Sequence, residues 1–294
     1  MIKKNSPQAW ILAARPKTLS ASATPVLIAC ALAYHDHSFQ WQPALVCLLF
    51  AVIAQVIANF ANDYFDYKKG SDNHERLGPK RAVAEGWIAP RIMLRVTLAL
   101  LVLNLALGLL LLYYGGWILI FVGLLVAIFA FAYSGGPYPL AYHGWGDVCV
   151  LVFFGIIPVG FTYYVQTLQW SLPVTICGIS AGLVIINILV ANNYRDRFTD
   201  AKSGKKTSIV LFGEKFGRWF YLFNGIIAVA GCQRFWWEKA VWASLLPLVY
   251  LVFHILTWKE MITINEGKAL IGSLEKTARN VLIFGAMLSI GLLL

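Results

Sequence analysis

The amino-acid sequence predicts an all-α integral membrane protein with about nine transmembrane helices. Three observations lead to this fold class: the composition, a series of long apolar runs, and a one-sided distribution of Lys and Arg. Of the 294 residues, 59% are hydrophobic and 13% are charged, and the mean hydropathy is +0.69. Water-soluble domains carry roughly 45–50% apolar and about 25% charged residues, so the composition excludes an ordinary soluble domain.

The apolar runs extend along the whole chain. A helix needs roughly 17–25 mostly apolar residues to cross the hydrocarbon core of a membrane. The seventh run is the weakest, because it is short and ends at Gln233 and Arg234. In chain order, the predicted spans are 19–34, 43–61, 96–114, 117–133, 148–164, 172–191, 219–232, 240–258 and 278–294.

The basic residues gather on one side of the membrane if every run spans it. With the N-terminus in the cytoplasm, all of the 24 Lys and Arg except Arg234 and Lys239 fall on the cytoplasmic side. Cytoplasmic loops of membrane proteins carry such an excess of Lys and Arg. The distribution therefore predicts a cytoplasmic N-terminus and an outside C-terminus. It also accounts for the net charge of +10 without a nucleic-acid partner.

Two acidic motifs stand at the cytoplasmic ends of the second and sixth runs. Residues 61–66 and 191–196 share the pattern A-N-[D/N]-Y-x-D and lie 130 positions apart. A carboxylate costs on the order of +2.5 to +3.5 kcal/mol at the centre of a membrane helix and less at its ends, so acids that persist there indicate function. The spacing also suggests an internal repeat within a single domain, about 16–134 and 145–258, plus a last helix at 278–294.

The spacing within each motif predicts a metal site. On a helix, Asn62 and Asp66 share one face because they are four residues apart. A second polar stripe, with the same spacing, consists of Asn192, Asp196 and Asp200. If the two helices face each other, these side chains form an all-oxygen pocket. Such a pocket suits Mg²⁺, which prefers octahedral oxygen ligands and bridges to substrate phosphates.

Basic residues surround both motifs. Acids alone would bind a metal, whereas acids with many cations indicate a polyanion held jointly by metal and by Lys and Arg. A diphosphate leaving group fits this description best. An ordinary interfacial excess of positive charge explains the same Lys and Arg equally well. The candidates for binding the diphosphate are Arg15, Arg81, Arg195, Lys205 and Lys206.

At these motifs the chain resembles the UbiA superfamily of intramembrane aromatic prenyltransferases. The Asp-rich motifs of that family are of the N-D-x-x-D and D-x-x-x-D types, which residues 62–66 and 196–200 match. One departure is Gly70, which stands where a third Asp is expected, with Asp72 two residues later as a further candidate metal ligand. The resemblance is strongest to the 1,4-dihydroxy-2-naphthoate polyprenyltransferase branch, through residues 62–72, 78–81, 133–138, 144–147 and 192–207.

The resemblance implies nine helices around a central cavity open toward the cytoplasmic side, in the bacterial inner membrane. It implies Mg²⁺ as cofactor, a polyprenyl diphosphate as donor, 1,4-dihydroxy-2-naphthoate as acceptor, and surrounding membrane lipid. The reaction would transfer the prenyl group with loss of CO₂ in menaquinone biosynthesis. Tyr133 and Tyr64 are the candidates to stabilise an allyl cation. Asp63 and Asp147 are candidates to orient the acceptor hydroxyl groups, with a helix cap or an interfacial anchor as the alternative.

Two other functions stay open on the sequence alone. A sibling prenyltransferase would use 4-hydroxybenzoate, homogentisate or haem as acceptor, and retention of a carboxylate in the product would separate the benzoate reaction. A membrane transporter also carries intramembrane acids and repeats. The transporter is disfavoured because the acids lie at one membrane face, and polar residues within the spans are isolated, such as Asn104 and His254.

Overall fold

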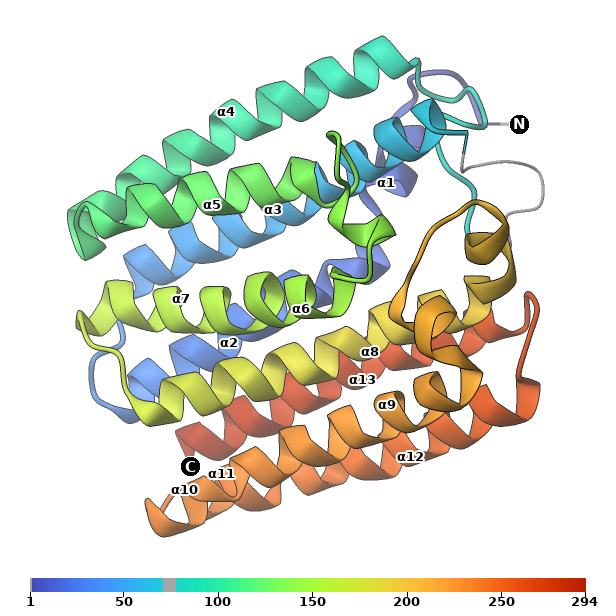
Figure 1. Ribbon diagram of the computed structural model, residues 1–294. Helices are drawn as coiled ribbons and strands as arrows, with labels where there is room; N and C mark the ends of the chain where they lie inside the picture. The colour runs from blue at the N-terminus through green and yellow to red at the C-terminus, as the bar shows by residue number, and fades with distance from the viewer. Residues whose placement is uncertain (1, 71–77) are drawn as a thin grey trace.

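Helices make up the regular structure of the protein. The computed structural model describes residues 2–70 and 78–294, and within these ranges it contains α-helices, 3₁₀ turns at Pro16–Thr18 and Leu140–Tyr142, a π-helical segment at Leu151–Ile156, and no strand. The α-helices, labelled as in Figure 1, are α1 Pro7–Ala14, α2 Ser20–His35, α3 Trp41–Lys68, α4 Pro90–Gly115, α5 Ile118–Ala132, α6 Gly146–Val150, α7 Ile157–Thr167, α8 Leu172–Lys202, α9 Ser208–Cys232, α10 Arg234–Trp237, α11 Val241–Leu245, α12 Pro247–Ile264 and α13 Leu270–Leu293.

Every predicted span falls on helical structure. Among the described residues, 6 helical segments are long and apolar enough to cross a membrane, and the pair formed by α1 and α2, bent by 51°, would make a seventh. The helix α5 is apolar but shorter. The all-helical membrane fold is therefore confirmed, whereas nine crossings and the internal repeat stay predictions.

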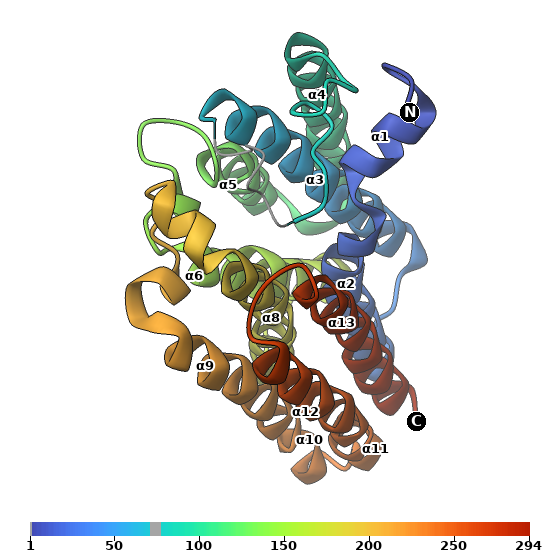
Figure 2. The same cartoon turned by 90° about the vertical axis from the view of Figure 1, so that its right-hand side faces the viewer.

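The long helices run side by side in two groups with α2 and α7 between them (Figures 1 and 2). The first group is α3, α4 and α5, and the second is α8, α9, α12 and α13. The helix α2 packs against α3, α7, α8 and α13, and α7 packs against both α3 and α8. In the described part of the chain, α3 and α8 are thus held apart by α2 and α7. These two separated helices carry the acidic motifs.

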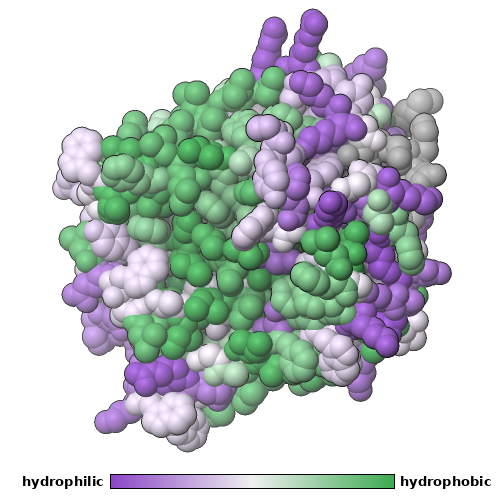
Figure 3. All heavy atoms as spheres, in the orientation of Figure 1, coloured by the Kyte–Doolittle hydropathy of each residue, from purple (hydrophilic) through white to green (hydrophobic). Residues whose placement is uncertain are grey.

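One end of the bundle is polar. Figure 3 shows hydrophilic residues gathered mainly at the end where Figure 1 places the N-terminus and the last turns of α3 and α8. The sides of the bundle expose large apolar side chains, among them Val102 on α4 and Phe121 and Ile128 on α5. Such a continuous apolar side surface fits lipid, because soluble proteins rarely expose one. The two chain ends lie at opposite ends of the bundle.

A proline disturbs the helix of the fifth predicted span. Pro158 has no backbone N–H to donate to the carbonyl group four residues earlier, and the π-helical segment Leu151–Ile156 precedes it. Gly155 lies in this segment and contacts α8. A Cβ atom on Gly155 would lie 2.5 Å from the carbonyl oxygen of Gly178 and 2.6 Å from Cα of Gly182. The three glycines therefore allow the two backbones to approach closely.

Candidate active site

The first acidic motif lies in the last turns of α3, and its partners come from loops. Asp66 Oδ1 accepts a hydrogen bond from the Tyr142 hydroxyl at 3.2 Å, and Asp66 Oδ2 lies 3.4 Å from a terminal guanidinium nitrogen of Arg81. This ion pair is largely buried, with 9% of the Arg81 side chain and 17% of the Asp66 side chain exposed. One turn earlier, Asn62 Oδ1 accepts a hydrogen bond from the Ser134 hydroxyl.

The second acidic motif lies near the end of α8, and its main partner is on the same helix. The Arg195 guanidinium donates to both carboxylate oxygens of Asp196, from Nε at 2.8 Å and from a terminal nitrogen at 2.6 Å. The same terminal nitrogen donates to Asn192 Oδ1 at 2.5 Å. Because a fully buried guanidinium requires a partner, Arg195 fixes the orientation of Asp196. One turn further along, Lys205 Nζ lies 3.5 Å from Asp200 Oδ1.

Tyr142 connects the two motifs. While its hydroxyl donates to Asp66, its carbonyl oxygen accepts a hydrogen bond from the Lys206 backbone N–H at 3.0 Å. The Nζ atom of Lys205, which pairs with Asp200, lies 6.0 Å from the centre of the Tyr142 ring. The contacts of this one residue therefore join the ends of the two separated helices.

Tyr133 and Asp147 lie near the two acidic motifs. The Tyr133 hydroxyl is close enough to interact electrostatically with Asp147, Asp66 and Asp200, and its ring centre lies 5.6 Å from that of Phe129. Asp147 belongs to the first turn of α6. One of its carboxylate oxygens is buried without a hydrogen-bond partner among the described residues. The carboxylate also lies within hydrogen-bonding reach of the Ser208 hydroxyl.

Asp63 holds the loop beside the first motif. It is 1% exposed, and its carboxylate accepts hydrogen bonds from the backbone N–H groups of Ala82 at 3.0 Å and Val83 at 3.2 Å. These bonds fix the turn that carries Arg81. The contacts of Asp63 are those of an anchor.

The remaining predicted site residues are Arg15, Lys206 and Asp72. A terminal nitrogen of Arg15 lies 3.4 Å from the Asn59 carbonyl oxygen, and the charge of Arg15 acts on Asp63. Lys206 is exposed. Asp72 lies outside the described residues.

The donor chemistry of the two motifs fits Mg²⁺. Within the described residues, no group of three or more His, Cys, Asp or Glu side chains is arranged to hold one ion. Mg²⁺ in proteins is usually held by only one or two carboxylates and completes its octahedron with water and phosphate oxygens. Two oxygen sets of this kind are present, Asn62 with Asp66 on α3, and Asn192 with Asp196 and Asp200 on α8.

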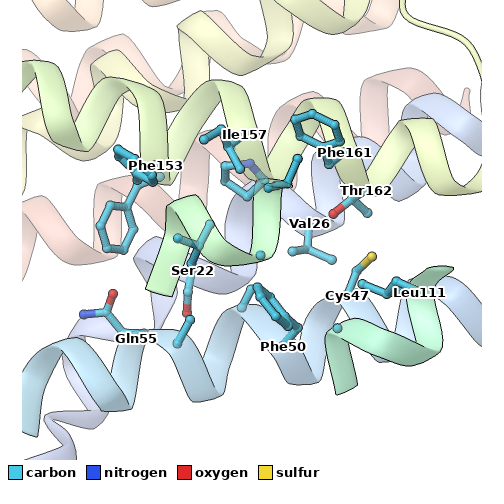
Figure 4. Close-up of a pocket in the computed structure, with 18 of the residues that line it drawn as sticks. Ser22, Val26, Cys47, Phe50, Gln55, Leu111, Phe153, Ile157, Phe161 and Thr162 are labelled. Atoms are coloured by element: carbon cyan, nitrogen blue, oxygen red, sulfur yellow. The ribbon is translucent and has the colours of Figure 1, made fainter. Parts of the chain in front are cut away.

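An apolar cleft leads away from the first motif between α2, α3, α4, α5 and α7 (Figure 4). Its cavity volume is about 120 Å³. On α3, its lining residues include Ala51, Gln55 and Ala58. Residues three or four apart share a helix face, so this face continues directly to Asn62 and Asp66.

Sequence reasoning missed Ser134 and Tyr142 as site residues. Both lie in the 134–147 segment between α5 and α6, which is long and polar enough in the sequence to carry a site. That loop was the available signal, since no spacing rule links a loop residue to a helix so far away in the chain.

Acids and cations at the polar end of an apolar cleft, inside a helical membrane bundle, define a membrane enzyme for substrates with an anionic head and a hydrocarbon tail. Residues 22–264 match the UbiA prenyltransferase family, and the chain belongs to that family. It is therefore a prenyltransferase.

Named relatives agree with this assignment, and a solved structure shares the fold. The chain is 34% identical over 302 aligned positions to the 1,4-dihydroxy-2-naphthoate octaprenyltransferase of Escherichia coli, with 98% of this chain and 96% of the relative covered. It is 36% identical over 225 residues to the enzyme of the same name from Haemophilus influenzae, with 72% and 71% covered. A UbiA homologue from Archaeoglobus fulgidus, solved with GPP and Mg²⁺, has the same fold, with a TM-score of 0.64 at 15% identity over 96% of this chain and 99% of that one.

Proposed function

We propose that this protein transfers a polyprenyl group from a polyprenyl diphosphate to 1,4-dihydroxy-2-naphthoate with loss of CO₂, in menaquinone biosynthesis. The observations that support the proposal are the apolar cleft, which shares a face of α3 with the first motif, and the contacts of Tyr142 with both motif regions. A substrate with a charged head and a long hydrocarbon tail matches these two parts. Relatives named for this reaction extend over nearly the whole chain, which supports the choice of acceptor.

The diphosphate head binds at the polar end of the bundle. Arg81 and Lys205 approach it from opposite sides, because each is paired with an acid of a different motif. Guanidinium and ammonium groups bind phosphate oxygens through charge-assisted hydrogen bonds. Arg195 contributes by orienting the second motif from within α8. Arg15 and Lys206 add positive charge near this polar end.

Mg²⁺ is the cofactor that the oxygen donors favour. When bound, it neutralises the negative charge that develops on the diphosphate leaving group. A solved homologue that contains both Mg²⁺ and GPP supports this choice. The proposed ligands, direct or through water, are Asn62, Asp66, Asp72, Asn192, Asp196 and Asp200.

The polyprenyl tail lies in the apolar cleft. Each CH₂ group moved from water into such surroundings contributes about 0.8 kcal/mol, so a tail of several isoprene units binds without polar contacts. Most of the side chains labelled in Figure 4 are apolar, namely Val26, Phe50, Leu111, Phe153, Ile157 and Phe161.

A ring carbon of the acceptor attacks the allylic carbon while the bond from that carbon to the diphosphate oxygen breaks. The ring carbon that has formed the new bond then loses its carboxyl group as CO₂, and the electrons of that broken C–C bond restore the aromatic ring without a strong base. Aromatic faces stabilise a nearby cation, and Tyr133 and Phe129 lie where the polar end meets the cleft. Asp147, whose carboxylate lies beside the Ser208 hydroxyl, accepts a hydrogen bond from an acceptor hydroxyl, and Asp63 acts through the loop that it holds.

The polar end faces the cytoplasm of a bacterial inner membrane in this proposal. The excess of Lys and Arg at this end supports that orientation. The N-terminus is then cytoplasmic and the C-terminus lies outside, as two chain ends at opposite ends of the bundle require.

The test supplies the purified protein with Mg²⁺, a polyprenyl diphosphate and one acceptor labelled in its carboxyl carbon. We expect release of labelled CO₂ with 1,4-dihydroxy-2-naphthoate and no reaction with 4-hydroxybenzoate. Prenylation of 4-hydroxybenzoate with retention of the label would assign the sibling reaction instead. Absence of transfer to either acceptor would overturn the proposed activity.

A further inference from the structure

Gln55 is a polar side chain in the wall of the apolar cleft (Figure 4). It lies on α3 seven residues before Asn62, which is nearly two helical turns and about 10.5 Å along the axis, on almost the same face. Only 8% of Gln55 is exposed. Burial of an amide is unfavourable unless its polar atoms are hydrogen-bonded, so the partners of Gln55 reveal its role.

The amide nitrogen of Gln55 is held by the protein. Nε2 donates to Asn59 Oδ1 at 3.3 Å and, at the long distance of 3.5 Å, to Thr18 Oγ1. The Asn59 amide has one possible orientation, because its Nδ2 donates at 2.9 Å to the carbonyl oxygen of Ala14, which only accepts. Asn59 therefore presents its oxygen to Gln55, and Gln55 must present its nitrogen in return.

The amide oxygen of Gln55 consequently faces the cleft. Oε1 is buried and has no hydrogen-bond partner among the described residues. In Figure 4 this oxygen points to the side on which Phe153 lies, and the nitrogen points away. Ser22, the nearby polar residue of the lining, uses its hydroxyl to donate to the Leu19 carbonyl oxygen at 2.9 Å. A buried acceptor without a donor is unfavourable, so it favours a ligand that supplies a donor.

The two proposed substrates differ in what they offer to this oxygen. A polyprenyl diphosphate carries a hydrocarbon tail and phosphate oxygens that accept hydrogen bonds. A dihydroxyaromatic acid carries hydroxyl groups that donate them. We propose that Gln55 Oε1 accepts a hydrogen bond from a hydroxyl group of the aromatic acceptor, and that Gln55 selects hydroxylated rings. This inference rests on the proposed function and names the residue that recognises its second substrate.

The position of Gln55 suits the reaction. The two-turn separation leaves room for one aromatic ring between Gln55 and a diphosphate head at Asn62. A hydroxyl group that donates a hydrogen bond leaves more electron density in its ring, which makes the adjacent ring carbon a better nucleophile. That carbon bonds to the allylic carbon, the diphosphate leaves with the electron pair of the broken C–O bond, and the carboxylate leaves as CO₂. The electrons of the broken C–C bond restore the aromatic ring, and no net proton is transferred.

The inference also gives a role to the segment before the first predicted span. Thr18 donates its hydroxyl hydrogen to the Arg15 carbonyl oxygen at 2.9 Å, which leaves the Thr18 oxygen to accept from Asn59 at 3.2 Å and from Gln55. The residues around Arg15 and Thr18 are therefore positioning residues, which hold the Gln55 amide in the orientation that faces the cleft.

The test compares acceptors that differ in a single hydrogen-bond donor. 1,4-Dihydroxy-2-naphthoate is measured beside its two monomethyl ethers, and 4-hydroxybenzoate beside 4-methoxybenzoate, with wild type and Gln55→Leu. We expect the wild type to lose on the order of 100-fold or more in kcat/KM with one of the naphthoate ethers, since a site built for a hydroxyl group rejects an analogue without it. Gln55→Leu is expected to raise the KM for the acceptor about tenfold and to keep the wild-type KM for the diphosphate. In this variant, kcat/KM for the dihydroxy compound should exceed that for the ether by less than about tenfold.

Thr162→Val is the matched control, because Thr162 lines the opposite wall of the same cleft. This variant is expected to keep the wild-type ratio between the hydroxyl acceptor and its ether. A wild type that uses both naphthoate ethers as well as the dihydroxy compound would overturn the inference without any variant, so misfolding of Gln55→Leu cannot hide the answer.

The outcomes separate this inference from the proposed function. Gln55→Leu protein that folds and retains wild-type discrimination against the ether overturns the role of Gln55 and leaves the proposed function intact. A wild type inactive with both acid series overturns the proposed function. Equilibrium dialysis of the same hydroxyl and ether pairs against wild type and Gln55→Leu then decides the role of Gln55, because binding needs no turnover.

Discussion

The two acidic motifs carry the same residue types but are supported in different ways. On α3, the partner Arg81 comes from the segment that follows the helix, and Ser134 and Tyr142 come from a loop that is remote in the sequence. On α8, the partner Arg195 is on the same helix and Lys205 follows directly after its end. The second motif is therefore arranged by local structure, whereas the first depends on tertiary contacts.

The surroundings of the two motifs also differ in how deeply they are buried. The Arg195 side chain is 0% exposed, and α8 is more deeply buried in the bundle than α3. Contacts between a helix and a loop open more easily than contacts within a packed helix. We therefore expect the α8 half to behave as a rigid platform and the α3 half to adapt to the substrate. The variants below test this difference.

Removal of divalent metal is expected to have the largest effect, and to affect both halves alike. After dialysis against EDTA, we expect no measurable prenyl transfer from a labelled diphosphate, because the charge of the leaving group is no longer neutralised. Addition of Mg²⁺ should restore the activity. Undiminished turnover in EDTA would contradict the metal assignment.

The substitutions Asp66→Ala and Asp196→Ala are expected to lower kcat on the order of 100-fold or more each, as the loss of a group that stabilises transition-state charge does. Their effects on stability should differ. Loss of Asp196 leaves the buried Arg195 without its carboxylate, which destabilises by about 3–5 kcal/mol, whereas loss of Asp66 affects an ion pair held by a loop.

Thermal unfolding in detergent measures this contrast, with Asp66→Asn and Asp196→Asn as controls that keep the side-chain shape. Equal losses of stability for the two alanine variants would show that both halves are built alike.

Exchange of the arginines for lysine sharpens the comparison. Arg81→Lys is expected to raise the KM for the diphosphate about tenfold at an unchanged unfolding temperature, because lysine lacks the planar fork that binds phosphate at two points. Arg195→Lys is expected to lower the unfolding temperature, because it cannot make both bonds to Asp196. The reverse pattern would exchange the roles assigned to the two residues.

Tyr142→Phe is expected to have the smallest effect. It removes the hydroxyl group that contacts Asp66 and keeps the ring beside Lys205. Loss of one such hydrogen bond corresponds to about a 2-fold to 10-fold decrease in kcat/KM. Tyr138→Phe is the control, since Tyr138 lies in the same loop and is exposed.

The sequence predicted the helices and the polar end because both depend on local patterns. Apolar runs locate the spans, and the four-residue spacing places Asn192 and Asp196 on one face of a helix that continues past the predicted end at 191 to Lys202. The contact between Asp66 and Tyr142 was not predictable in this way. It joins a helix to a loop across the folded bundle, and spacing rules relate only residues of the same element.

The orientation of Gln55 could not be predicted for a related reason. Its amide is fixed by Asn59 on the same helix, but Asn59 is fixed in turn by Ala14 from another element. A helix pattern places Gln55 on a face, and the folded chain decides which of its two atoms points into the cleft.

The π-helical segment Leu151–Ile156 has a consequence for sequence alignment. A π-helical turn contains about one residue more than the α-helical turn that it replaces. Asp147 lies before this segment and Phe161 lies after it. If the homologue has a regular helix here, an ungapped alignment that matches Asp147 correctly matches Phe161 to a residue one position away. That residue lies about 100° away around the helix axis. Transfer of residue roles between this protein and such a homologue therefore requires a one-residue gap at this position.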